Sequence, residues 1–370
     1  MKKILWLLPV IFLFMECKQE NVRYNLIVGT YTAPGDSEGI YTYSFNSETG
    51  DAVQKAVAKN IINPSYLTLS EDNKFVYAVG EDAERSTVNA FNYDSKKNEL
   101  SFINSQRAEG EDPCYIISDD KNVIVANYSG GSIGVFGIEA NGALTPVKQL
   151  IKHSGRSITE RQTSPHVHMV KFTPDNKYVL VNDLGKDKVF LYTYNPDGGD
   201  RVLVAKDSVD VQAGSGPRHL VFSKDGDFAY LLHELDGRVT VLTYKDEALK
   251  IIQESSVVAQ DFKGENGGAD IHVSPDGKFL YATNRGSENN ISLFAIGNDG
   301  KIELKKQYST LGKGPRNFVI DPSGNFLLVG HQYTNDVVIF KRDQVTGELT
   351  DSKKRIKVGA PVCLVFAPAK

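Results

Sequence analysis

The chain is built from short stretches in which apolar and polar residues alternate, each closed by a tight turn. Residues 214–244, GSGPRHLVFSKDGDFAYLLHELDGRVTVLTY, show the plan in full. An apolar stretch leads to a Lys-Asp-Gly turn, a second apolar stretch ends in His233-Glu234, and a third stretch alternates strictly. A period of two bounded by Asp-Gly turns is typical of antiparallel hairpins. The pattern therefore predicts β-strands and not helices.

This unit recurs along the chain. Corresponding turns follow one another at roughly 50-residue intervals, which is the repeat length of a propeller blade, and lie near Glu71, Asp119, Pro174, Lys224, Pro275 and Pro322. The alternating third stretch occurs seven times, at residues 39–45, 87–93, 132–138, 188–194, 238–244, 290–296 and 336–342. Each is followed by a turn and a polar fourth stretch, such as residues 300–309. Four short antiparallel strands per repeat predict the blades of a β-propeller.

The two ends of the chain complete one repeat between them. Residues 361–368, PVCLVFAP, match the first strand of the other repeats, and then the chain stops. The missing second strand is supplied by YNLIVGTYT at residues 24–32. Pairing these segments closes the ring and removes two unpaired sheet edges. The prediction is an all-β, seven-bladed propeller forming a single domain over residues 24–370.

The first 17 residues differ in kind from the rest. Lys2 and Lys3 precede an apolar run at residues 4–15, which is short for a membrane span and typical of a secretory signal. Cys17 follows that run after one residue, Glu16, and is similar to the lipid-acceptor cysteine of bacterial lipoproteins. We expect an exported protein, in the periplasm or anchored in the cell envelope through a lipid on Cys17. A plain anchor helix and a cytoplasmic location are the alternatives.

Charge and cysteine content narrow the range of partners. The net charge is −4, from 42 basic and 46 acidic residues spread along the chain. No basic stripe is present, so we expect neither nucleic acid nor a membrane surface as a partner, apart from the possible lipid. Cys114 and Cys363 lie in apolar first strands, where buried free thiols are expected. No metal, no cofactor and a monomeric state are predicted.

Counting from the turns predicts which side chains reach one mouth of the central channel. Six residues before a turn, where first strands begin, stand His168, Arg218 and Arg316. Ten residues after a turn, where second strands end, stand Glu81, Glu234, Arg285 and Gln332. Antiparallel neighbours bring both kinds of position to the same end of a sheet. Arg218 and Glu234 are therefore expected to lie close together.

Each of these residues also has a structural explanation. Arg218 and Glu234 could form a salt bridge that contributes little, and His168 could satisfy a backbone carbonyl group. Several charges around one cavity nevertheless favour a functional site. Arginines there repel a divalent cation and favour a carboxylate or phosphate. Four further residues at second-strand ends are candidates for contacts with substrate hydroxyl groups: Asn127, Tyr128, His233 and Asn284.

An insert at residues 152–165 precedes the first strand of one repeat. A loop of this length on a propeller is expected to form a rim over one mouth, where such loops often serve binding. The alternative is a tolerated surface insertion.

The motifs together resemble a known family. GSGPRHLVF with its following HEL, GADIHVSPDGKFLYATNR, GKGPRNFVIDPSGNFLLVG and the His-Val-His unit are similar to the lactonase family of seven-bladed propellers. That family includes bacterial 6-phosphogluconolactonases and a fungal carboxymuconate-cyclising enzyme. The resemblance implies a metal-free site whose catalytic group corresponds here to His168, Arg218, Glu234 and Arg285.

The function expected from this resemblance is hydrolysis of a sugar lactone. Glu234 or His168 would take a proton from water as it attacks the ring carbonyl. Arg218 or Arg285 would stabilise the oxyanion, and the other arginine, with Arg316, would hold a carboxylate or phosphate. Two alternatives stay open: a non-catalytic envelope propeller that binds carbohydrate or protein, and an isomerase that forms a lactone.

Overall fold

The computed structural model describes residues 23–33, 35–259 and 262–369. The predicted leader at residues 1–17, with Cys17, lies outside this range, so export and lipidation stay predictions. Three one-turn 3-10 helices occur in the described part: η1 (Ala83–Arg85), η2 (Glu160–Gln162) and η3 (Leu184–Lys186). None of the helices found there has the length and apolar character that a membrane crossing needs.

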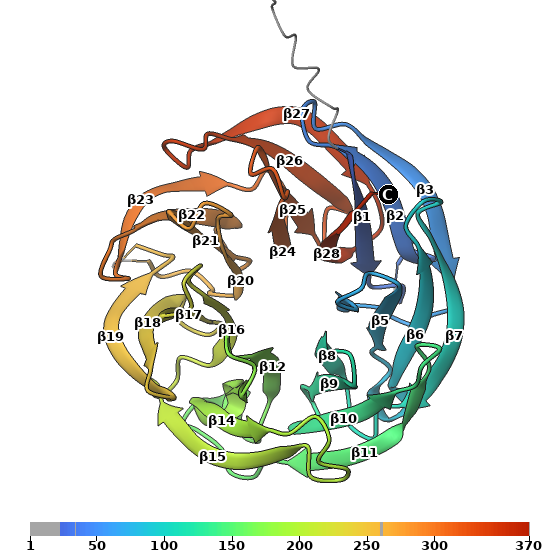
Figure 1. The fold of residues 1–370 in the computed structure, drawn as a ribbon. Coiled ribbons are helices and arrows are strands. Elements are labelled where there is room, and N and C mark those ends of the chain that lie inside the picture. The colour runs from blue at the N-terminus through green and yellow to red at the C-terminus, as the bar shows by residue number, and fades with distance from the viewer. Residues whose placement is uncertain (1–22, 34, 260–261, 370) are drawn as a thin grey trace, which may run out of the picture.

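The strands form seven four-stranded antiparallel sheets arranged around a common axis (Figure 1). Blade 1 holds β4 (Leu67–Leu69), β5 (Phe75–Gly80), β6 (Thr87–Asp94) and β7 (Glu99–Arg107), and blade 2 holds β8 (Pro113–Ser118), β9 (Asn122–Asn127), β10 (Ser132–Ile138) and β11 (Leu144–Lys152). Blade 3 holds β12 (Val167–Phe172), β13 (Tyr178–Asp183), β14 (Lys188–Tyr194) and β15 (Leu203–Asp210), and blade 4 holds β16 (Pro217–Phe222), β17 (Phe228–His233), β18 (Arg238–Lys245) and β19 (Ala248–Ser256). Blade 5 holds β20 (Gly268–Val273), β21 (Phe279–Asn284), β22 (Asn290–Ile296) and β23 (Ile302–Ser309), and blade 6 holds β24 (Pro315–Ile320), β25 (Phe326–His331), β26 (Asp336–Arg342) and β27 (Leu349–Lys357). The predicted propeller is confirmed.

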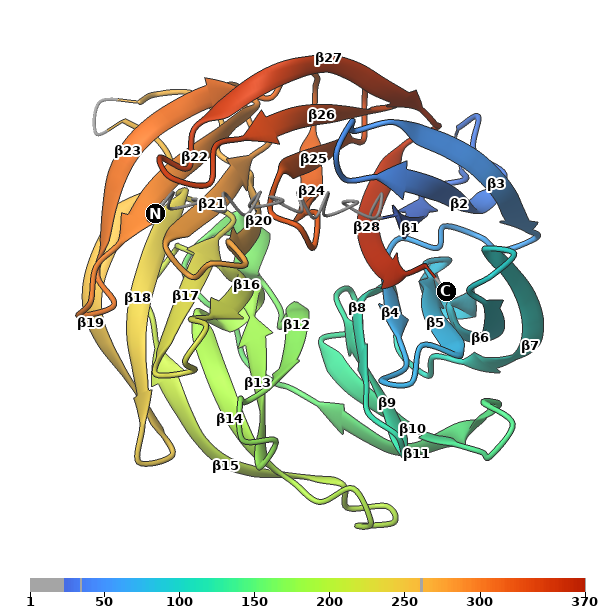
Figure 2. The same cartoon turned by 45° about the horizontal axis from the view of Figure 1, so that its top comes forward.

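Blade 7 joins the two ends of the described chain. Its order is β28 (Pro361–Pro368), β1 (Arg23–Thr30), β2 (Gly39–Asn46) and β3 (Ala52–Lys59). β28 and β1 pair antiparallel from Tyr24–Pro368 to Thr30–Pro361, so the last strand lies beside the first (Figure 2). The predicted closure is therefore confirmed, and it completes the blade in which the two ends of the described chain meet.

The core lies between neighbouring blades. In blade 4, Tyr230 and Leu232 of β17 pack with Leu280 and Ala282 of β21 in blade 5, and all four are fully buried. The outermost strand of each blade has no neighbour beyond it, which explains why strands such as β23 are polar and largely exposed. Apolar residues thus fill the spaces between sheets, and the inner strands are left to line the channel.

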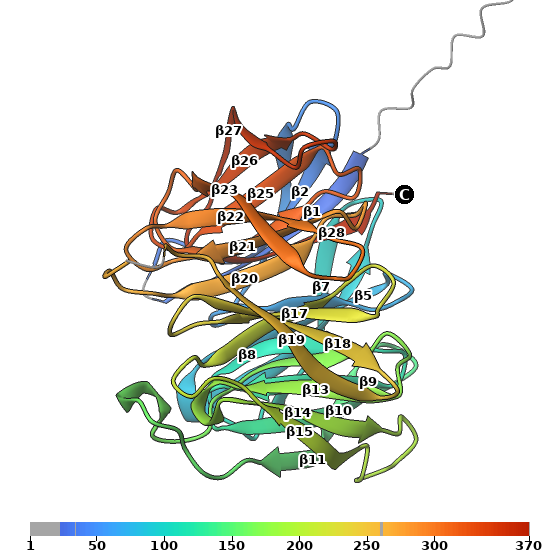
Figure 3. The same ribbon diagram turned by 90° about the vertical axis from the view of Figure 1, so that its left-hand side faces the viewer.

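The loop between β11 and β12 extends beyond the blades on one face of the ring (Figure 3). It is the insert predicted to form a rim, and it contains η2. A reciprocal side-chain and backbone pairing between Thr159 and Gln162 fixes this turn, and the Gln162 amide also donates to the Leu184 carbonyl. The loop is therefore fastened to blade 3.

Candidate active site

A cavity of about 270 Å³ opens where first strands begin and second strands end. Polar and charged side chains dominate its wall, which consists of Tyr31, Glu81, Asp112, Cys114, Tyr128, Ser129, Arg161, His168, Arg218, Glu234, Arg285 and Arg316. The residues come from blades 1 to 7 of the ring and from the rim loop. The cavity is therefore a product of the whole propeller and not of one blade.

First strands contribute residues that stand out of the hydrogen-bonded ladder. The register of β16 against β17 shifts between Pro217 and His219, which leaves Arg218 unpaired in a β-bulge. The same shift frees His168 in β12 and Arg316 in β24. A bulge redirects the side chain of its extra residue. Repetition of this device around the ring turns one local irregularity into a set of converging side chains.

Second strands contribute the residue that directly follows them. Glu81 follows β5, Glu234 follows β17 and Arg285 follows β21. Because β16 and β17 are antiparallel and Pro217 pairs with His233, Glu234 lies at the same end of blade 4 as Arg218. Arg218 Nη1 donates to Glu234 Oε2 at 2.6 Å, so the predicted proximity of this pair is confirmed.

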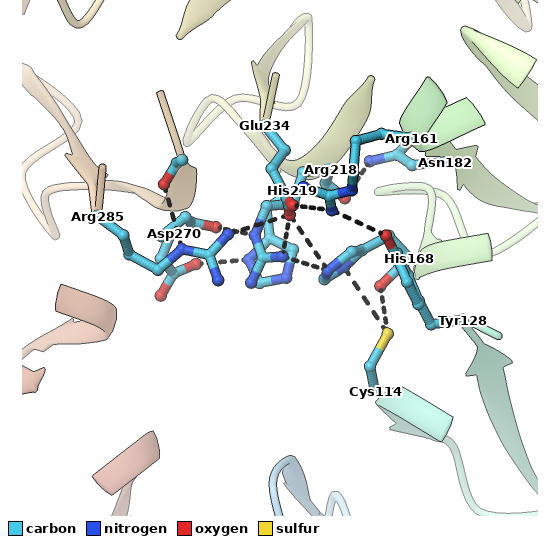
Figure 4. A network of polar contacts seen from close by, with 12 residues as sticks. Cys114, Tyr128, Arg161, His168, Asn182, Arg218, His219, Glu234, Asp270 and Arg285 are labelled. Atoms are coloured by element: carbon cyan, nitrogen blue, oxygen red, sulfur yellow. Dashed lines mark hydrogen bonds and ion pairs between the residues drawn. The ribbon is translucent and has the colours of Figure 1, made fainter. Parts of the chain in front are cut away.

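Glu234 is the centre of an arginine cluster (Figure 4). Besides Arg218, Arg285 Nη2 lies 3.1 Å from its Oε2 atom and Arg161 Nη2 lies 2.9 Å from Oε1. The residue is only 7% exposed. Burial alone would raise the pKa of Glu234, but the three guanidinium groups hold it well below its usual value. Glu234 is therefore a fixed carboxylate anion at every physiological pH.

His168 lies against this cluster and is buried. Its Nε2 atom contacts Arg218 Nη1, and its Nδ1 atom lies 3.8 Å from Cys114 Sγ. A guanidinium group can only donate, so Nε2 must accept and the ring proton belongs on Nδ1. Burial, followed by the positive charge of Arg218, lowers the pKa of His168 far below the ordinary value. The imidazole is therefore neutral, with its Nε2 lone pair engaged by Arg218.

Arg285 has a lowered pKa but stays positively charged at neutral pH. Burial and the nearby charge of Arg218 lower its pKa to about 10, and Glu234 opposes them. Its Nε atom donates to the Gly267 carbonyl at 3.2 Å, which fixes the direction of the guanidinium plane. Arg285 and Arg218 thus present two held cations on one side of the cavity.

The opposite side of the cavity holds a second carboxylate in a different setting. The Tyr31 hydroxyl lies 3.2 Å from both oxygens of Glu81, and the Ser65 hydroxyl donates to Oε1. No basic side chain among the described residues lies within 4 Å of this carboxylate. Burial raises the pKa of Glu81, and Arg316 and the two hydroxyl donors only partly offset the effect. We call Tyr31, Ser65, Glu81 and Arg316 the Glu81 wall.

The side chain of Arg316 makes neither a hydrogen bond nor an ion pair within the described part of the chain. Its guanidinium group lies over the Tyr31 ring, with Cζ 5.2 Å from the ring centroid. Burial alone would lower the pKa of Arg316, but electrostatic interactions with Tyr31 and Glu81 raise it above the usual value. A charged guanidinium that faces a cavity without a carboxylate partner is suited to bind an anion.

Comparison with known proteins assigns the fold to a family. The family model described as lactonase, 7-bladed β-propeller, matches residues 25–366. The chain belongs to the lactonase family. The 6-phosphogluconolactonase of Bacillus subtilis is 36% identical over 349 residues, which cover 93% of this chain and 98% of that protein. The resemblance inferred from the motifs is thereby confirmed, and the protein is a lactonase.

Two further relatives agree with this lactonase assignment. The 6-phosphogluconolactonase of Formosa agariphila is 36% identical over 332 residues, covering 88% of this chain and 94% of that protein. The solved structure of the periplasmic gluconolactonase of Pseudomonas aeruginosa superposes with a TM-score of 0.89 at 35% identity. The superposition covers 94% of this chain and 100% of the Pseudomonas aeruginosa chain.

The lactonase cavity brings together six of the residues singled out from the sequence. His168, Arg218, Glu234 and Arg285 form one contiguous group, and Tyr128 and Arg316 line the same cavity. Tyr128 stacks on His166, with ring centroids 4.5 Å apart, and so His166 supports the wall from behind. The chemical roles assigned to these residues stay predictions.

Three other candidates lie elsewhere, which corrects the expectation that they reach substrate. Asn127, His233 and Asn284 are fully buried and do not line the cavity. Each is the last residue of a second strand, one position before the cavity residue, and successive side chains on a strand point to opposite faces. Their side chains form hydrogen bonds inside the protein instead. Asn127 Nδ2 donates to Ser132 Oγ, and Asn284 Oδ1 accepts from the Gly267 amide at 2.8 Å. His233 Nε2 pairs with Thr240 Oγ1 at 2.8 Å.

Sequence reasoning assigned no role to several residues of the lactonase cavity. Arg161 belongs to the rim loop, and its ion pair with Glu234 brings this loop to the cavity. Cys114 and Cys363 are free and buried as predicted, yet Cys114 also faces the cavity. Glu81 was counted at the mouth without a role. Among the described residues, no group of three or more His, Cys, Asp or Glu side chains is placed to hold a metal ion.

Proposed function

We propose that this lactonase hydrolyses the ester bond of a sugar lactone of the gluconolactone type in the cavity described above. Two relatives are named 6-phosphogluconolactonase and one gluconolactonase, so the aldonolactone ring is common to all three. The observation that carries the proposal is the convergence of four arginines on one open cavity, with three of them held by ion pairs to the single carboxylate of Glu234. That arrangement suits a neutral ester that becomes an oxyanion during the reaction.

The reaction needs a site for the developing negative charge. Water adds to the lactone carbonyl carbon, and the carbonyl oxygen becomes an oxyanion. Arg218 and Arg285 are held in place by Glu234, and by backbone carbonyls of Ala269 and Gly267, so they need not reorganise when this charge appears. Preorganised donors of this kind commonly contribute a few kcal/mol to transition-state stabilisation.

Arg316 is proposed to hold an anionic substituent of the substrate, a phosphate or carboxylate. Its side chain faces the cavity and has no carboxylate partner in the described part of the chain. The other three arginines of the wall are already bound to Glu234. A phosphate would therefore find its strongest available partner at Arg316.

Export of the protein is proposed from the leader-like residues 1–17, with lipidation of Cys17 as its anchored form. The periplasmic gluconolactonase of Pseudomonas aeruginosa supports this location. Outside the cytoplasm an unphosphorylated lactone is the expected substrate, and the anionic substituent at Arg316 would then be a carboxylate. Cell fractionation of strains that produce the parent and Cys17→Ala tests this step, since a lipid-anchored parent is recovered with membranes and the variant is not.

The activity is tested by supplying purified protein with glucono-1,5-lactone and its 6-phosphate and recording acid release in a pH-stat. Spontaneous hydrolysis is subtracted, and Arg218→Ala and Glu234→Gln are measured beside the parent. We expect a parent rate well above the uncatalysed rate and much lower rates in both variants. A parent no faster than buffer, or three equal rates, contradicts the hydrolase. Catalysed formation of lactone from the open acid would indicate the isomerase.

A further inference from the structure

The cavity contains two glutamates at equivalent places in their blades, on opposite sides of the ring. Glu81 follows β5 in blade 1, and Glu234 follows β17 in blade 4. Where two carboxylates share a site, their environments decide which one stays ionised and which one exchanges protons. Assigning the proton-transfer step therefore requires a comparison of the lone pairs that each group still has free.

Glu234 has little capacity left to accept a proton. Its Oε1 atom accepts from Arg161, and its Oε2 atom accepts from Arg218 and lies 3.1 Å from Arg285. These positive charges make the carboxylate a weak base. Taking a proton would also break the ion pairs that hold the oxyanion donors in position. Glu234 is better explained as the residue that positions the arginines.

His168 is no better placed as the base. Its Nε2 lone pair is directed at Arg218, and its Nδ1 atom carries the ring proton. Asp112 is the other carboxylate that lines the cavity and the rival of Glu81; its Oδ1 accepts from the Ala83 amide at 3.0 Å and its Oδ2 accepts from the Ser129 hydroxyl at 2.6 Å. A base must have a free lone pair within reach of the attacking water.

Glu81 meets that requirement. It lines the cavity, it has no ion pair within the described residues, and its Oε2 atom accepts only one shared hydrogen bond, from Tyr31. Ser65 and Tyr31 hold the carboxylate in one orientation, and Glu81 lines the cavity. Burial raises its pKa, which makes it a stronger base than an ordinary glutamate.

We propose that Glu81 is the general base of the lactonase, an inference that rests on the proposed function. Glu81 takes a proton from water while the water oxygen bonds to the carbonyl carbon and the carbonyl electron pair moves to the oxygen facing Arg218 and Arg285. The tetrahedral intermediate then breaks the bond between the carbonyl carbon and the ring oxygen. The ring oxygen takes the proton back from Glu81, and the product acid releases its own proton to solvent. Base and oxyanion donors thus lie on opposite walls, with the carbonyl between them.

The test measures kcat/KM for glucono-1,5-lactone against pH in the parent and in Glu81→Gln. Gln keeps the size of the side chain and can still accept from Ser65 and Tyr31, but it cannot take a proton. The expected loss is about 10²–10⁴-fold. The parent profile should fall on the acid side as Glu81 becomes protonated, and this acid limb should be absent from the residual activity of Glu81→Gln. Glu84→Gln, the same change at an exposed site outside the cavity, is the matched control.

A second variant keeps the test independent of how well Glu81→Gln folds. Tyr31→Phe removes one donor to the ionised carboxylate, so the pKa of Glu81 rises further. Because the base works in its ionised form, the acid limb should move to higher pH. The charged or titratable groups that face Glu81 are Tyr31, Arg316, Asp112 and Cys114.

The outcomes separate the two proposals. An active parent with Glu81→Gln within a few-fold of it, or with the acid limb unchanged in both Glu81→Gln and Tyr31→Phe, overturns the role of Glu81 and leaves the lactonase assignment intact. A parent that hydrolyses neither lactone overturns the proposed substrate class instead. A role limited to structure would lower activity at all pH values without removing or moving the limb.

Discussion

Glu234 and Glu81 occupy the same position in two blades, yet their surroundings give them opposite properties. Glu234 lies among Arg161, Arg218 and Arg285, and its pKa is held below the ordinary value. Glu81 is held by two hydroxyl groups, and burial raises its pKa. The propeller supplies equivalent positions, and the neighbouring blades decide what each residue does there. One carboxylate can therefore keep cations in place while the other exchanges protons.

The largest difference is expected in stability. Replacing Glu234 by Gln leaves the buried Arg218 and Arg285 without their counter-ion, and removing one partner of a buried ion pair costs about 3–5 kcal/mol. Replacing Glu81 by Gln removes a buried charge that has no ion pair, so the free energy of unfolding should stay the same or rise. Urea unfolding of both variants and the parent at neutral pH measures this contrast. Equal destabilisation by the two substitutions would contradict it.

The same contrast has a pH dependence with a definite sign. The folded-state pKa of Glu234 lies below its unfolded-state value, so its stabilisation is present above the unfolded value. That stabilisation is lost as the pH falls through the folded-state value. The gap in unfolding free energy between the parent and Glu234→Gln should therefore be largest near neutral pH and should narrow in acid. A gap that widens in acid would contradict the assignment of Glu234 as the buried counter-ion.

An intermediate effect is expected at Arg316, the cation of the Glu81 wall. If it binds the anionic substituent, Arg316→Gln should raise KM for 6-phosphogluconolactone by about 10–100-fold, the loss of one charge-assisted contact of about 1.5–3 kcal/mol. KM for unphosphorylated gluconolactone should change little. Arg107→Gln, at an exposed site on β7, is the control. Equal changes for both substrates would place the anion elsewhere.

Arg316→Gln also affects the neighbouring base. The positive charge of Arg316 lowers the pKa of Glu81, so its removal should move the acid limb of the neutral-substrate profile to higher pH. This shift has the same direction as that expected for Tyr31→Phe. Two substitutions from different blades would then report on one carboxylate.

The sequence predicts the residues whose position is fixed by distance from a turn. His168, Arg218 and Arg316 lie at a constant distance from their turns, and each of them forms a bulge and lines the cavity. The count carries over between blades 3, 4 and 6 because their first and second strands all have six residues. It also locates Ser65, six residues before Glu71, although an uncharged side chain gave no reason to select it.

Other parts of the site escape such a count for physical reasons. Tyr31 belongs to blade 7, whose first and second strands come from opposite ends of the chain, so no turn links them to count from. Arg161 comes from an irregular loop, which has no register at all. His233 fails for a third reason, because an error of one residue on a strand reverses the direction of the side chain.

The smallest effect is expected at Arg161, the member of the Glu234 cluster that comes from the rim loop. Its side chain is 59% exposed, and exposed ion pairs contribute up to about 1 kcal/mol. Arg161→Gln should therefore change the free energy of unfolding by no more than about that amount, because Arg218 and Arg285 still neutralise Glu234.

The kinetic effect of Arg161→Gln should be a few-fold rise in KM for 6-phosphogluconolactone, because a cation at the open rim attracts this anionic substrate without contacting the reacting atoms. Added salt should reduce the difference from the parent, since exposed charges are screened. Arg156→Gln, an exposed arginine of the same loop outside the cavity, is the control. A fall in kcat as large as that of Arg218→Ala would instead place Arg161 among the oxyanion donors, and the rim loop would then be part of the catalytic wall.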